Sequence, residues 1–422
     1  MRVGAVQALV AALTVGALAL TGATATAVAP IPVPASIPSN CSVDNAPALS
    51  NWLNSLPANS TVNFPANGCF LINSTLWVHN TTGLTINGNN TLLLQSVAPA
   101  VPAPFIFLTQ DTNLAMSNAV VIGAYNGTNG GAGQEGDYGF LLEADHCVYL
   151  THLNVNNIQG DFINLNAPNT GDTGSDTSLN SNVSVTNSTF TNAGYHGITV
   201  EAANGATFNR DTFTNMGTDA IDFEYDNYST VFVNGQPTEA AEDNISITNN
   251  TFTNFTGDWF ASLQGQSPGV QEQNVNLSCN TLDANSPLIQ DIGTNPATTP
   301  TQYQNRGLIV TLNKNLMPAL GTSGASIADP NLGHVAAMQI QFVTNATIAA
   351  NTLPLYDGMP GYYANTPYIA VLQAYGIQNL SIQTNDFTGA YDILQAGSAG
   401  NTGTPCGNSY GVNGAQTDGA CK

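Results

Sequence analysis

Short apolar segments recur along the chain with the same internal spacing. Two apolar residues separated by one residue are followed, after four more residues, by a third apolar residue, as in Val183, Val185 and Phe190. Apolar residues two positions apart are typical of a strand with one buried face. Further copies of the pattern begin at Val148, Ala206, Ile245, Val275, Val310, Ala346 and Leu380.

A polar residue recurs two positions before the last apolar residue of many copies. This slot holds Asn or Asp, residues that tolerate left-handed backbone and suit a stacked tight turn. The shortest repeat is about 23 residues, and longer ones are explained by loops inserted at a corner. We therefore predict an all-β solenoid of short parallel strands in one domain. The slot is filled by Asp211, Asn250, Asn280, Asn315, Asn351 and Asn385.

The segments before the repeats predict an export signal and a cap. A basic start and an apolar run through Leu20 precede the small residues Ala25-Thr26-Ala27, a pattern typical of a signal peptide, with a retained N-terminal anchor as the alternative. Residues 44–56 carry Leu49, Trp52 and Leu53 at helical spacing, which predicts an amphipathic helix over the open end of the solenoid. The predicted organisation is a signal peptide over 1–27, a Pro-rich linker over 28–40, and one β-helix domain over 41–422.

Charge and cysteine content narrow the function and the compartment. The chain has 5 Lys and Arg against 27 Asp and Glu, a net charge of −22, which excludes a nucleic-acid partner because phosphate binding needs clustered cations. Secretion makes disulfides plausible, and Cys41–Cys69 and Cys406–Cys421 are the candidates. The repeat places Cys147 and Cys279 about four layers or 19 Å apart, so we predict that they do not bond.

The N-terminal part of the repeat region resembles a known superfamily. The segments LSNWLNSL (49–56), TVNF (61–64), FLINSTL (70–76) and LTINGNNTL (84–92) are similar to the entry of pectin-lyase-like, right-handed parallel β-helix proteins. The resemblance implies that fold for nearly all of the chain after the linker. It leaves the activity open, because the superfamily contains lyases, polygalacturonase-like hydrolases, epimerases, phage tailspikes and non-enzymatic adhesins.

Four segments align without gaps from the anchors Val155, Phe190, Phe213 and Phe252, and they define columns across neighbouring coils. The second column is a predicted structural Asn ladder, and the eighth, with Phe260 as its last member, is predicted to face inward. The seventh suggests a trough whose aromatic walls are Phe162 and Trp259. The second, sixth and ninth columns are Asn157, Asn192, Asn215 and Asn254; Asp161, His196, Asp219 and Asp258; and Asn164, Thr199, Asp222 and Ala261, while the eleventh includes Asn166, Glu201 and Glu224.

This stacking gathers carboxylates and one imidazole on adjacent coils. Such groups are what general acid–base chemistry requires, although Asp161, Asp219 and Asp258 can also simply cap backbone N–H groups at a corner. Tyr195-His196-Gly197-Ile198 resembles the Gly-His-Gly-Ile segment of polygalacturonase-like hydrolases. The segment 218–224 (TDAIDFE) resembles the Asp-Gly-Ile-Asp strand of β-helix glycoside hydrolases, but the order of the segments differs and the Arg-x-Lys motif is absent.

We therefore predict a secreted, monomeric glycoside hydrolase that acts on a polysaccharide through paired carboxylates. The alternatives are a Ca²⁺-dependent lyase or epimerase, with the acidic cluster holding the ion, and a non-catalytic glycan-binding protein of the cell surface. No cofactor is required, and no membrane span is expected after signal cleavage. The predicted catalytic residues are Asp219, Asp222, Glu224 and His196, and the predicted substrate-binding residues are Glu201, Asp161, Asp258, Trp259, Tyr225 and Tyr195.

Overall fold

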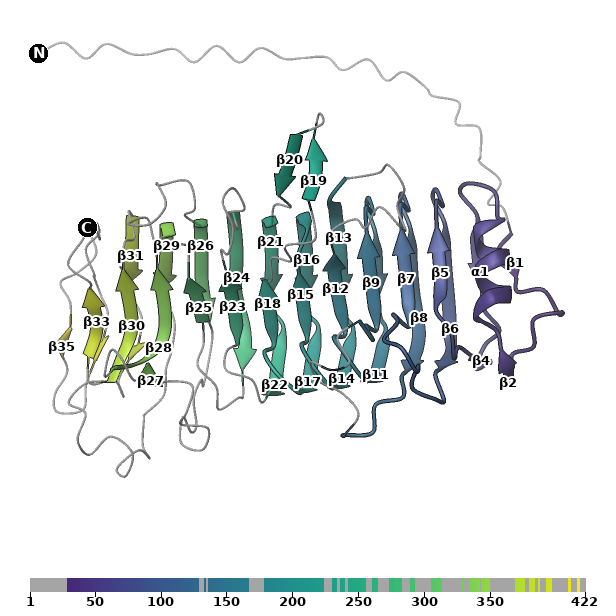
Figure 1. Cartoon of the computed structure of the whole chain (residues 1–422), viewed down its shortest axis with the longest axis horizontal. Coiled ribbons are helices and arrows are strands. Elements are labelled where there is room, and N and C mark those ends of the chain that lie inside the picture. Colours follow the sequence, from purple (N-terminus) through teal and green to yellow (C-terminus); the bar gives the residue numbers. More distant parts are fainter. Residues whose placement is uncertain are drawn as a thin grey trace, which may run out of the picture.

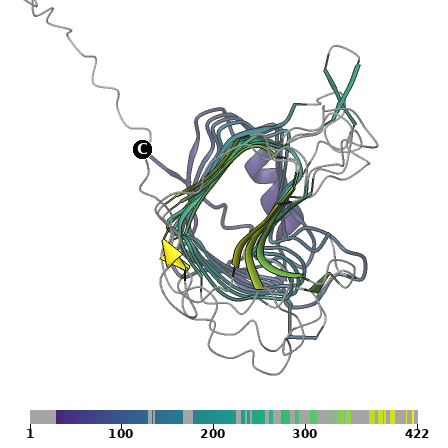
Figure 2. The same ribbon diagram turned by 90° about the vertical axis from the view of Figure 1, so that its left-hand side faces the viewer.

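The chain winds into a column of stacked coils, as Figure 1 shows for this computed structural model. The structure describes residues 29–128, 133, 136–166, 178–223, 230–233, 236–239, 242–255, 260–264 and 273–282, and beyond them only the backbone of individual strands. Seen along the axis, the strands of successive coils superpose (Figure 2). The architecture is the predicted right-handed parallel β-helix.

Two long parallel sheets form the wall of the column. The first contains β1 (Ile31–Pro32), β2 (Asn40–Asp44), β3 (Thr61–Asn63), β4 (Cys69–Leu71), β6 (Thr85–Leu94), β8 (Ala115–Ile122), β10 (Tyr149–Thr151), β11 (Asn154–Ile158), β13 (Asn180–Thr186), β14 (Thr189–Ala193), β16 (Ala203–Asn209), β17 (Thr212–Met216), β21 (Glu242–Thr248), β22 (Thr251–Phe255), β24 (Gln273–Leu282), β26 (Asn305–Leu312), β29 (Val343–Ala349) and β31 (Asn379–Gln383). We call it sheet A.

Sheet B forms the other side of the column. It contains β5 (Leu76–His79), β7 (Ile106–Thr109), β9 (Phe140–Glu143), β12 (Ile163–Asn166), β15 (Ile198–Val200), β18 (Ile221–Phe223), β23 (Ala261–Gln264), β25 (Ile289–Ile292), β27 (Ala328–Asp329), β28 (His334–Gln341), β30 (Ile369–Tyr375) and β33 (Asp392–Ala396). Apart from these sheets, a hairpin of β19 (Thr230–Val233) and β20 (Gln236–Glu239) projects from one corner (Figure 1), and the last small sheet is made of β32 (Asp386–Phe387), β34 (Ser409–Tyr410) and β35 (Gln416–Thr417).

A central coil shows how the repeat is built. β13 and β14 lie in sheet A and β15 lies in sheet B, so each coil has a first, a second and a third strand. The predicted anchors are in register, because Val155 pairs with Phe190, Phe190 with Phe213, and Phe213 with Phe252. The last three stack face to face inside the column, with ring centroids 4.7 and 4.9 Å apart. Aromatic stacking across layers thus fixes the register of the second strands.

The predicted register fails in one later copy of the repeat. Leu277 pairs with Val310 rather than with Leu312, so the pattern in β26 begins two residues earlier, at Leu308, than its apolar spacing suggested. The alternation has a period of two, and a slip of two residues therefore leaves it unchanged. Only the pairing itself distinguishes the two registers.

The corner between the first and second strands is a two-residue turn in the central coils. Its first residue has left-handed backbone, as in Asn187 and Arg210. Its second residue forms the buried ladder that we call the first-corner ladder: the side chain of each member accepts a hydrogen bond from the backbone N–H of the previous one. The predicted Asn/Asp slot is therefore the bonding position, and the residue before it carries the left-handed turn. The members are Ser188, Asp211, Asn250 and Asn280.

The N-terminal end is closed by α1 (Ala46–Asn54), as predicted. Leu49 and Leu53 are fully buried against the first coil. Ser50 Oγ accepts a hydrogen bond from the backbone N–H of Trp77, and Asn54 Nδ2 donates to the carbonyl of Trp77. The helix therefore satisfies backbone groups at the open edge of sheet B, which would otherwise invite pairing with another chain.

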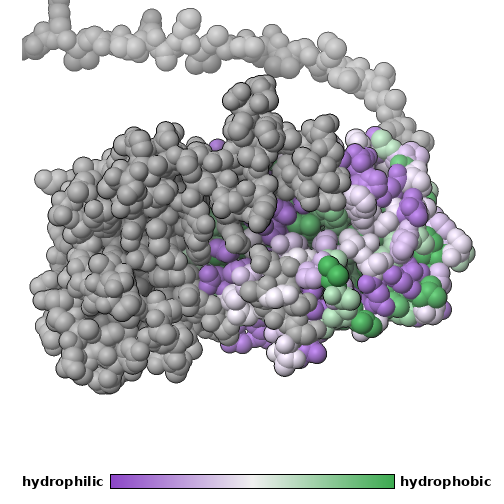
Figure 3. All heavy atoms as spheres, viewed as in Figure 1, coloured by the Kyte–Doolittle hydropathy of each residue, from purple (hydrophilic) through white to green (hydrophobic). Residues whose placement is uncertain are grey.

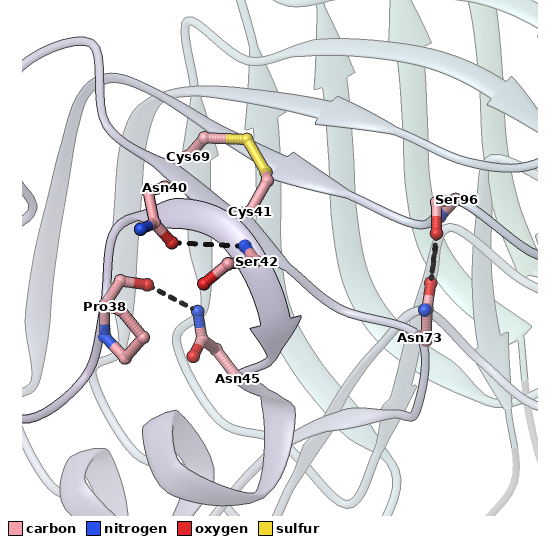
Figure 4. The surroundings of a disulfide bond; sticks show 8 residues. All are labelled: Pro38, Asn40, Cys41, Ser42, Asn45, Cys69, Asn73 and Ser96. Carbon is pink, nitrogen blue, oxygen red and sulfur yellow. Dashed lines mark hydrogen bonds between the residues drawn. A yellow bond between two sulfur atoms is a disulfide. The ribbon is translucent and has the colours of Figure 1, made fainter.

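The predicted disulfide Cys41–Cys69 joins β2 to β4, with the Cα atoms 5.1 Å apart (Figure 4). Cys147 and Cys279 are free, as predicted. The pair Cys406–Cys421 and the signal segment 1–27 lie outside the described residues. Within the part of the chain that the structure describes, no helix has the length and apolar character to cross a bilayer.

The Pro-rich stretch after residue 28 differs from a free linker. Ile31 and Pro32 form a strand that pairs with Val62 and Asn63 of β3, and Ile37 belongs to the core. Near the disulfide, Asn45 Nδ2 donates to the carbonyl of Pro38 at 2.7 Å (Figure 4). Proline at a sheet edge removes only a donor that has no partner there, which explains why a proline-rich segment can complete the first coil.

Candidate functional site

The turn between the second and third strands carries the predicted site residues. Asp161, His196 and Asp219 occupy this turn in three successive coils, as predicted. The backbone N–H of Phe162 donates to the carbonyl of His196, and that of Gly197 donates to the carbonyl of Asp219. A Cβ on Gly197 would lie 2.5 Å from the carbonyl oxygen of Ala220. Glycine at this position therefore lets the His196 turn pack directly on the next one.

The side chains of His196 and Asp222 lie close together on the side of sheet B that faces away from the core. Asp222 lies between the buried residues Ile221 and Phe223, so its side chain is on the opposite face of the strand. His196 Nε2 is 3.5 Å from Asp222 Oδ2. The two residues are 5% and 6% exposed, so the pair is largely removed from water.

Two neighbours hold the imidazole in place. Its Nδ1 lies 2.9 Å from the hydroxyl of Thr218, so both ring nitrogens have polar neighbours. The ring centroid of Tyr195 is 3.9 Å from that of His196. Tyr195 is half-buried, and it contacts the imidazole directly. These contacts fix the orientation of His196, which acid–base chemistry requires.

Asp161 lies beneath this turn and is only 1% exposed. Its Oδ1 accepts a hydrogen bond from the backbone N–H of His196 at 2.9 Å, and its Oδ2 accepts one from the Thr199 hydroxyl at 2.8 Å. Both carboxylate oxygens are thus used within the protein. This geometry gives Asp161 a positioning role toward His196, where the sequence suggested contact with substrate.

Glu201 lies at the end of the same face, one residue after β15. It is 7% exposed, and its Oε1 accepts a hydrogen bond from Asn164 Nδ2 at 2.8 Å. A second amide–carboxylate pair, Asn166 with Glu143, lies nearby along the strand β12. The predicted ninth column is confirmed for Asn164, Thr199 and Asp222, which pair in register.

The fourth segment departs from the predicted alignment by one residue. Ala261 pairs with Ile221, and Ser262 rather than Ala261 pairs with Asp222, because the turn after Phe255 holds one extra residue. Phe260 is fully buried and contacts the ring of Phe252, but it precedes the predicted slot. Four predicted site residues, Glu224, Tyr225, Asp258 and Trp259, lie outside the described residues.

The predicted aromatic trough is wrong for its first wall. Phe162 is fully buried and packs against Phe190 and Phe213, and Ala220 of the same column is also fully buried. The seventh position therefore points into the core, because the chain turns inward as it enters the third strand.

Sequence analysis missed an aromatic surface on the same face of sheet B. Trp77 is 36% exposed and stacks on Phe107, with centroids 5.8 Å apart and the rings inclined by 13°. Its Nε1 donates to the Thr109 hydroxyl at 2.9 Å. The alternation Leu76-Trp77-Val78-His79 was the available signal, since it places Trp77 opposite the buried Leu76 and Val78. Trp77 and Phe107 belong to the register column that contains Asp222 and continues beyond it to Ser262: Trp77, Phe107, Leu141, Asn164, Thr199, Asp222 and Ser262.

Buried carboxyl groups elsewhere support the corners. The first-corner ladder includes Asp211, and burial raises its pKa to about 7. A second ladder joins Thr81, Asp111, Asp145 and Asn180 at the corner after the third strand. There burial raises the pKa of Asp111 to about 6, and burial together with the charge of Asp111 raises that of Asp145 well above its usual range. These acids are structural and lie away from His196.

The described residues of the predicted acidic cluster do not include all of its members. Among all the residues that the structure describes, no three His, Cys, Asp or Glu side chains converge as a metal site requires. Glu224 and Asp258, which belong to the predicted acidic cluster, are not in the described set.

Comparison with known proteins supports the fold. No family model matches the chain, and no curated protein matches it by sequence. A solved structure of a mutant tailspike protein from E. coli bacteriophage HK620, in complex with a pentasaccharide, has a TM-score of 0.52 at 12% identity, covering 89% of this chain and 64% of that one. The fold resemblance expected from the sequence is thus confirmed, and at this identity it shows the fold alone.

Two further structures are similar at lower scores. The family 28 exopolygalacturonase of Yersinia enterocolitica has a TM-score of 0.40 at 14% identity, covering 89% of this chain and 77% of that one. A galactohydrolase named for a sulfated galactose and anhydrogalactose polymer has a TM-score of 0.49 at 10% identity, covering 85% and 87%.

Proposed function

We propose that the protein is a secreted, monomeric enzyme that binds a polysaccharide across the outer face of sheet B and hydrolyses it at the His196–Asp222 pair. The observation that carries the proposal is the 3.5 Å contact between His196 Nε2 and Asp222 Oδ2, with Thr218 at the other ring nitrogen. Burying an imidazole and a carboxyl group side by side is costly, and ionisable groups in such environments are concentrated at functional sites.

The proposal gives different roles to His196 and Asp222. A protonated His196 beside Asp222 stabilises its carboxylate form, which suits Asp222 to activate water. Protonation of the glycosidic oxygen then requires a second carboxyl group, from Asp219 or Glu224. Inverting glycosidases separate their carboxyl groups by about 6.5–9.5 Å, and Glu224, which follows Asp222 by two residues in the sequence, is a candidate by its sequence spacing alone.

Two further observations support a carbohydrate substrate. Trp77 presents an exposed aromatic face, supported by the buried Phe107 beneath it, in the same register column as Asp222, and aromatic faces suit the apolar faces of sugar rings. A tailspike of the same fold holds a pentasaccharide. The disulfide Cys41–Cys69 supports an oxidising compartment, consistent with secretion.

The competing proposal is a non-catalytic glycan-binding protein. It is favoured by the burial of the pair and by Asp161, whose oxygens both serve the turn. A lyase has less support, because lyases of this fold commonly use Arg or Lys, and Arg210 is exposed at a corner between the two strands of sheet A.

Mutation of the pair tests the proposal. Asp222→Asn and His196→Gln are each expected to lower the release of reducing ends at least about 100-fold, in a screen of neutral and acidic polysaccharides with and without chelator. Asp211→Asn is the matched control, because it neutralises an equally buried acid in another corner. Full activity in both site variants contradicts the proposal, unsaturated products absorbing in the ultraviolet indicate a lyase, and binding without turnover indicates the glycan-binding protein.

A further inference from the structure

A groove of about 530 Å³ lies on the flank of sheet A, where the second strands end. It runs across β11, β14, β17 and β22, and the loop after β8 forms one wall. The His196 site lies around the next turn, because Met216 and Gly217 line the groove while Thr218 contacts His196. The groove is therefore a separate surface from the outer face of sheet B.

The floor of the groove is a ladder of amides, which we call the groove ladder. It consists of one asparagine from each of the four strands: Asn157, Asn192, Asn215 and Asn254. The amide nitrogens of Asn192, Asn215 and Asn254 each donate to the amide oxygen of the preceding ladder member, at 2.9, 2.7 and 2.5 Å. All four have left-handed backbone, which repeats the same geometry in every coil.

The ladder uses only part of the bonding capacity of these side chains. An amide has two N–H donors and two acceptor lone pairs, and the ladder takes one donor and one lone pair from Asn192 and from Asn215. The remaining donors and acceptors repeat at about 4.8 Å, the spacing of neighbouring strands. This spacing is comparable to the length of one pyranose ring.

The wall is held firmly against this floor. The backbone N–H of Gly123 donates to the carbonyl of Asn156 at 2.8 Å, and that of Tyr125 donates to the carbonyl of Asn157 at 2.9 Å. The loop thus continues the pairing of β8 with β11 and sets the half-buried Tyr125 beside the ladder. Asn126 adds a further amide to the wall.

The lining selects one class of ligand. Among the described residues that line the groove, none is acidic or basic, so a charged ligand finds no counter-charge, and the net charge of −22 further disfavours an anion. An apolar ligand would remove the amides of the groove ladder from water without forming hydrogen bonds to them, and this costs free energy. Neutral hydroxyl groups both donate and accept, and sugar rings pack on a tyrosine face.

We propose that this groove binds a neutral oligosaccharide, laid along the axis of the solenoid, as a site separate from the His196–Asp222 pair. The proposal does not rest on the proposed hydrolysis, since it concerns binding alone. A polysaccharide bound in the groove would be tethered to the protein, and this would raise the effective concentration of that polysaccharide at the outer face of sheet B.

The test titrates maltohexaose, cellohexaose and laminarihexaose into Asp222→Asn protein by calorimetry, with hexagalacturonate and chitosan hexamer as charged comparators. At least one neutral hexaose is expected to bind with a Kd below about 10 mM. Tyr125→Ala should weaken that binding about tenfold. Asn254→Ala removes the last amide and leaves the other two ladder bonds intact, so it should weaken binding less.

Tyr149→Ala is the matched control, because Tyr149 is 46% exposed on β10 of the same sheet and does not line the groove. It should change the Kd less than twofold. The proposal is overturned if no neutral hexaose binds, if binding is insensitive to Tyr125→Ala, or if a charged hexamer binds equally well. The failure of hydrolysis would leave these binding results unaffected.

Discussion

Asp161 Oδ1 lies 2.9 Å from the backbone nitrogen of His196, one coil further along the solenoid. Asp161 therefore holds the backbone of the turn in place by a hydrogen bond, and the position of the imidazole of His196 depends on that backbone. Its other oxygen is used by the Thr199 hydroxyl. The turn that carries the His196 imidazole is thus supported from the coil before it.

Asp161→Ala should lower kcat with KM changed less than twofold. The substitution leaves the buried N–H of His196 without its acceptor, and we expect a loss of about 1–3 kcal/mol in the free energy of unfolding. Steady-state kinetics measures kcat and KM, and urea unfolding measures the free energy of unfolding. Thr199→Val, which removes only the second hydrogen bond, should have a smaller effect on each. A raised KM with unchanged kcat would instead indicate that Asp161 contacts substrate.

Asp211→Asn should stabilise the protein at alkaline pH. Burial raises the pKa of Asp211 from 3.8 to about 7, so the folded state binds a proton more tightly than the unfolded chain. That stabilisation is complete below about pH 4 and is lost as the pH rises through 7. Asparagine already fills the next two positions, where Asn250 and Asn280 donate to backbone carbonyls.

Thermal unfolding at pH 5 and pH 8 checks this expectation. The wild type should lose stability between the two values, by about 3 kcal/mol from this group, since about two pH units separate pH 5 from the pKa of about 7, and Asp211→Asn should lose less. Asp243→Asn, at a half-buried position on β21, is the control and should behave as the wild type. An Asp211→Asn protein less stable than the wild type at pH 8 would contradict the assignment.

Reduction of the disulfide should loosen the N-terminal cap. Cys41 and Cys69 are 28 residues apart in sequence, and closing a loop of this size contributes on the order of 3–4 kcal/mol. The double variant Cys41→Ser/Cys69→Ser should therefore melt at a lower temperature and become insensitive to dithiothreitol. Cys147→Ser, which removes a free thiol, should keep the sensitivity. Equal melting with and without reductant in the wild type would show that the bridge contributes nothing.

Trp77→Ala should raise KM for long polysaccharides several-fold and leave kcat unchanged. Trp77 lies five register positions from Asp222, about 24 Å along the column, so only a long chain reaches both. Trp77→Phe keeps an aromatic face over Phe107 and should retain most of the affinity. Tyr149→Ala serves as the exposed-aromatic control. If short oligosaccharides were affected as strongly as long ones, Trp77 would not be a distant contact.

The fold was predictable because its signals are local and repeated. Residues two apart in a strand report one buried face, and the same local pattern recurs around each anchor, such as Phe190 and Phe213, which stack in the structure. The stacked register likewise predicted that His196 and Asp222 lie on adjacent coils, one in a turn and the other on the strand of sheet B that follows the next turn. Alternation cannot reveal a turn that gains one residue, as before Ala261, or a slip of two residues, as at Val310.

The candidate site was harder to predict because the direction of a side chain in a turn depends on tertiary packing. Asp161 and Phe162 are adjacent in sequence, yet Asp161 bonds to the neighbouring turn while Phe162 enters the core. No periodicity distinguishes these positions. The proline-rich segment was predicted to be a linker, but Ile31 and Pro32 form an edge strand. An edge strand tolerates proline, because one side of it has no backbone N–H partner, so the composition of the segment did not distinguish a strand from a linker.

The two-residue corner of the central coils has a consequence for engineering. It keeps the same length beside β10, β13, β16 and β21, and the first-corner ladder binds each coil only to its immediate neighbours. We therefore expect that loops at the other two corners can be exchanged without changing the strand register of the solenoid. We also expect that a whole coil can be deleted by joining equivalent residues of this corner.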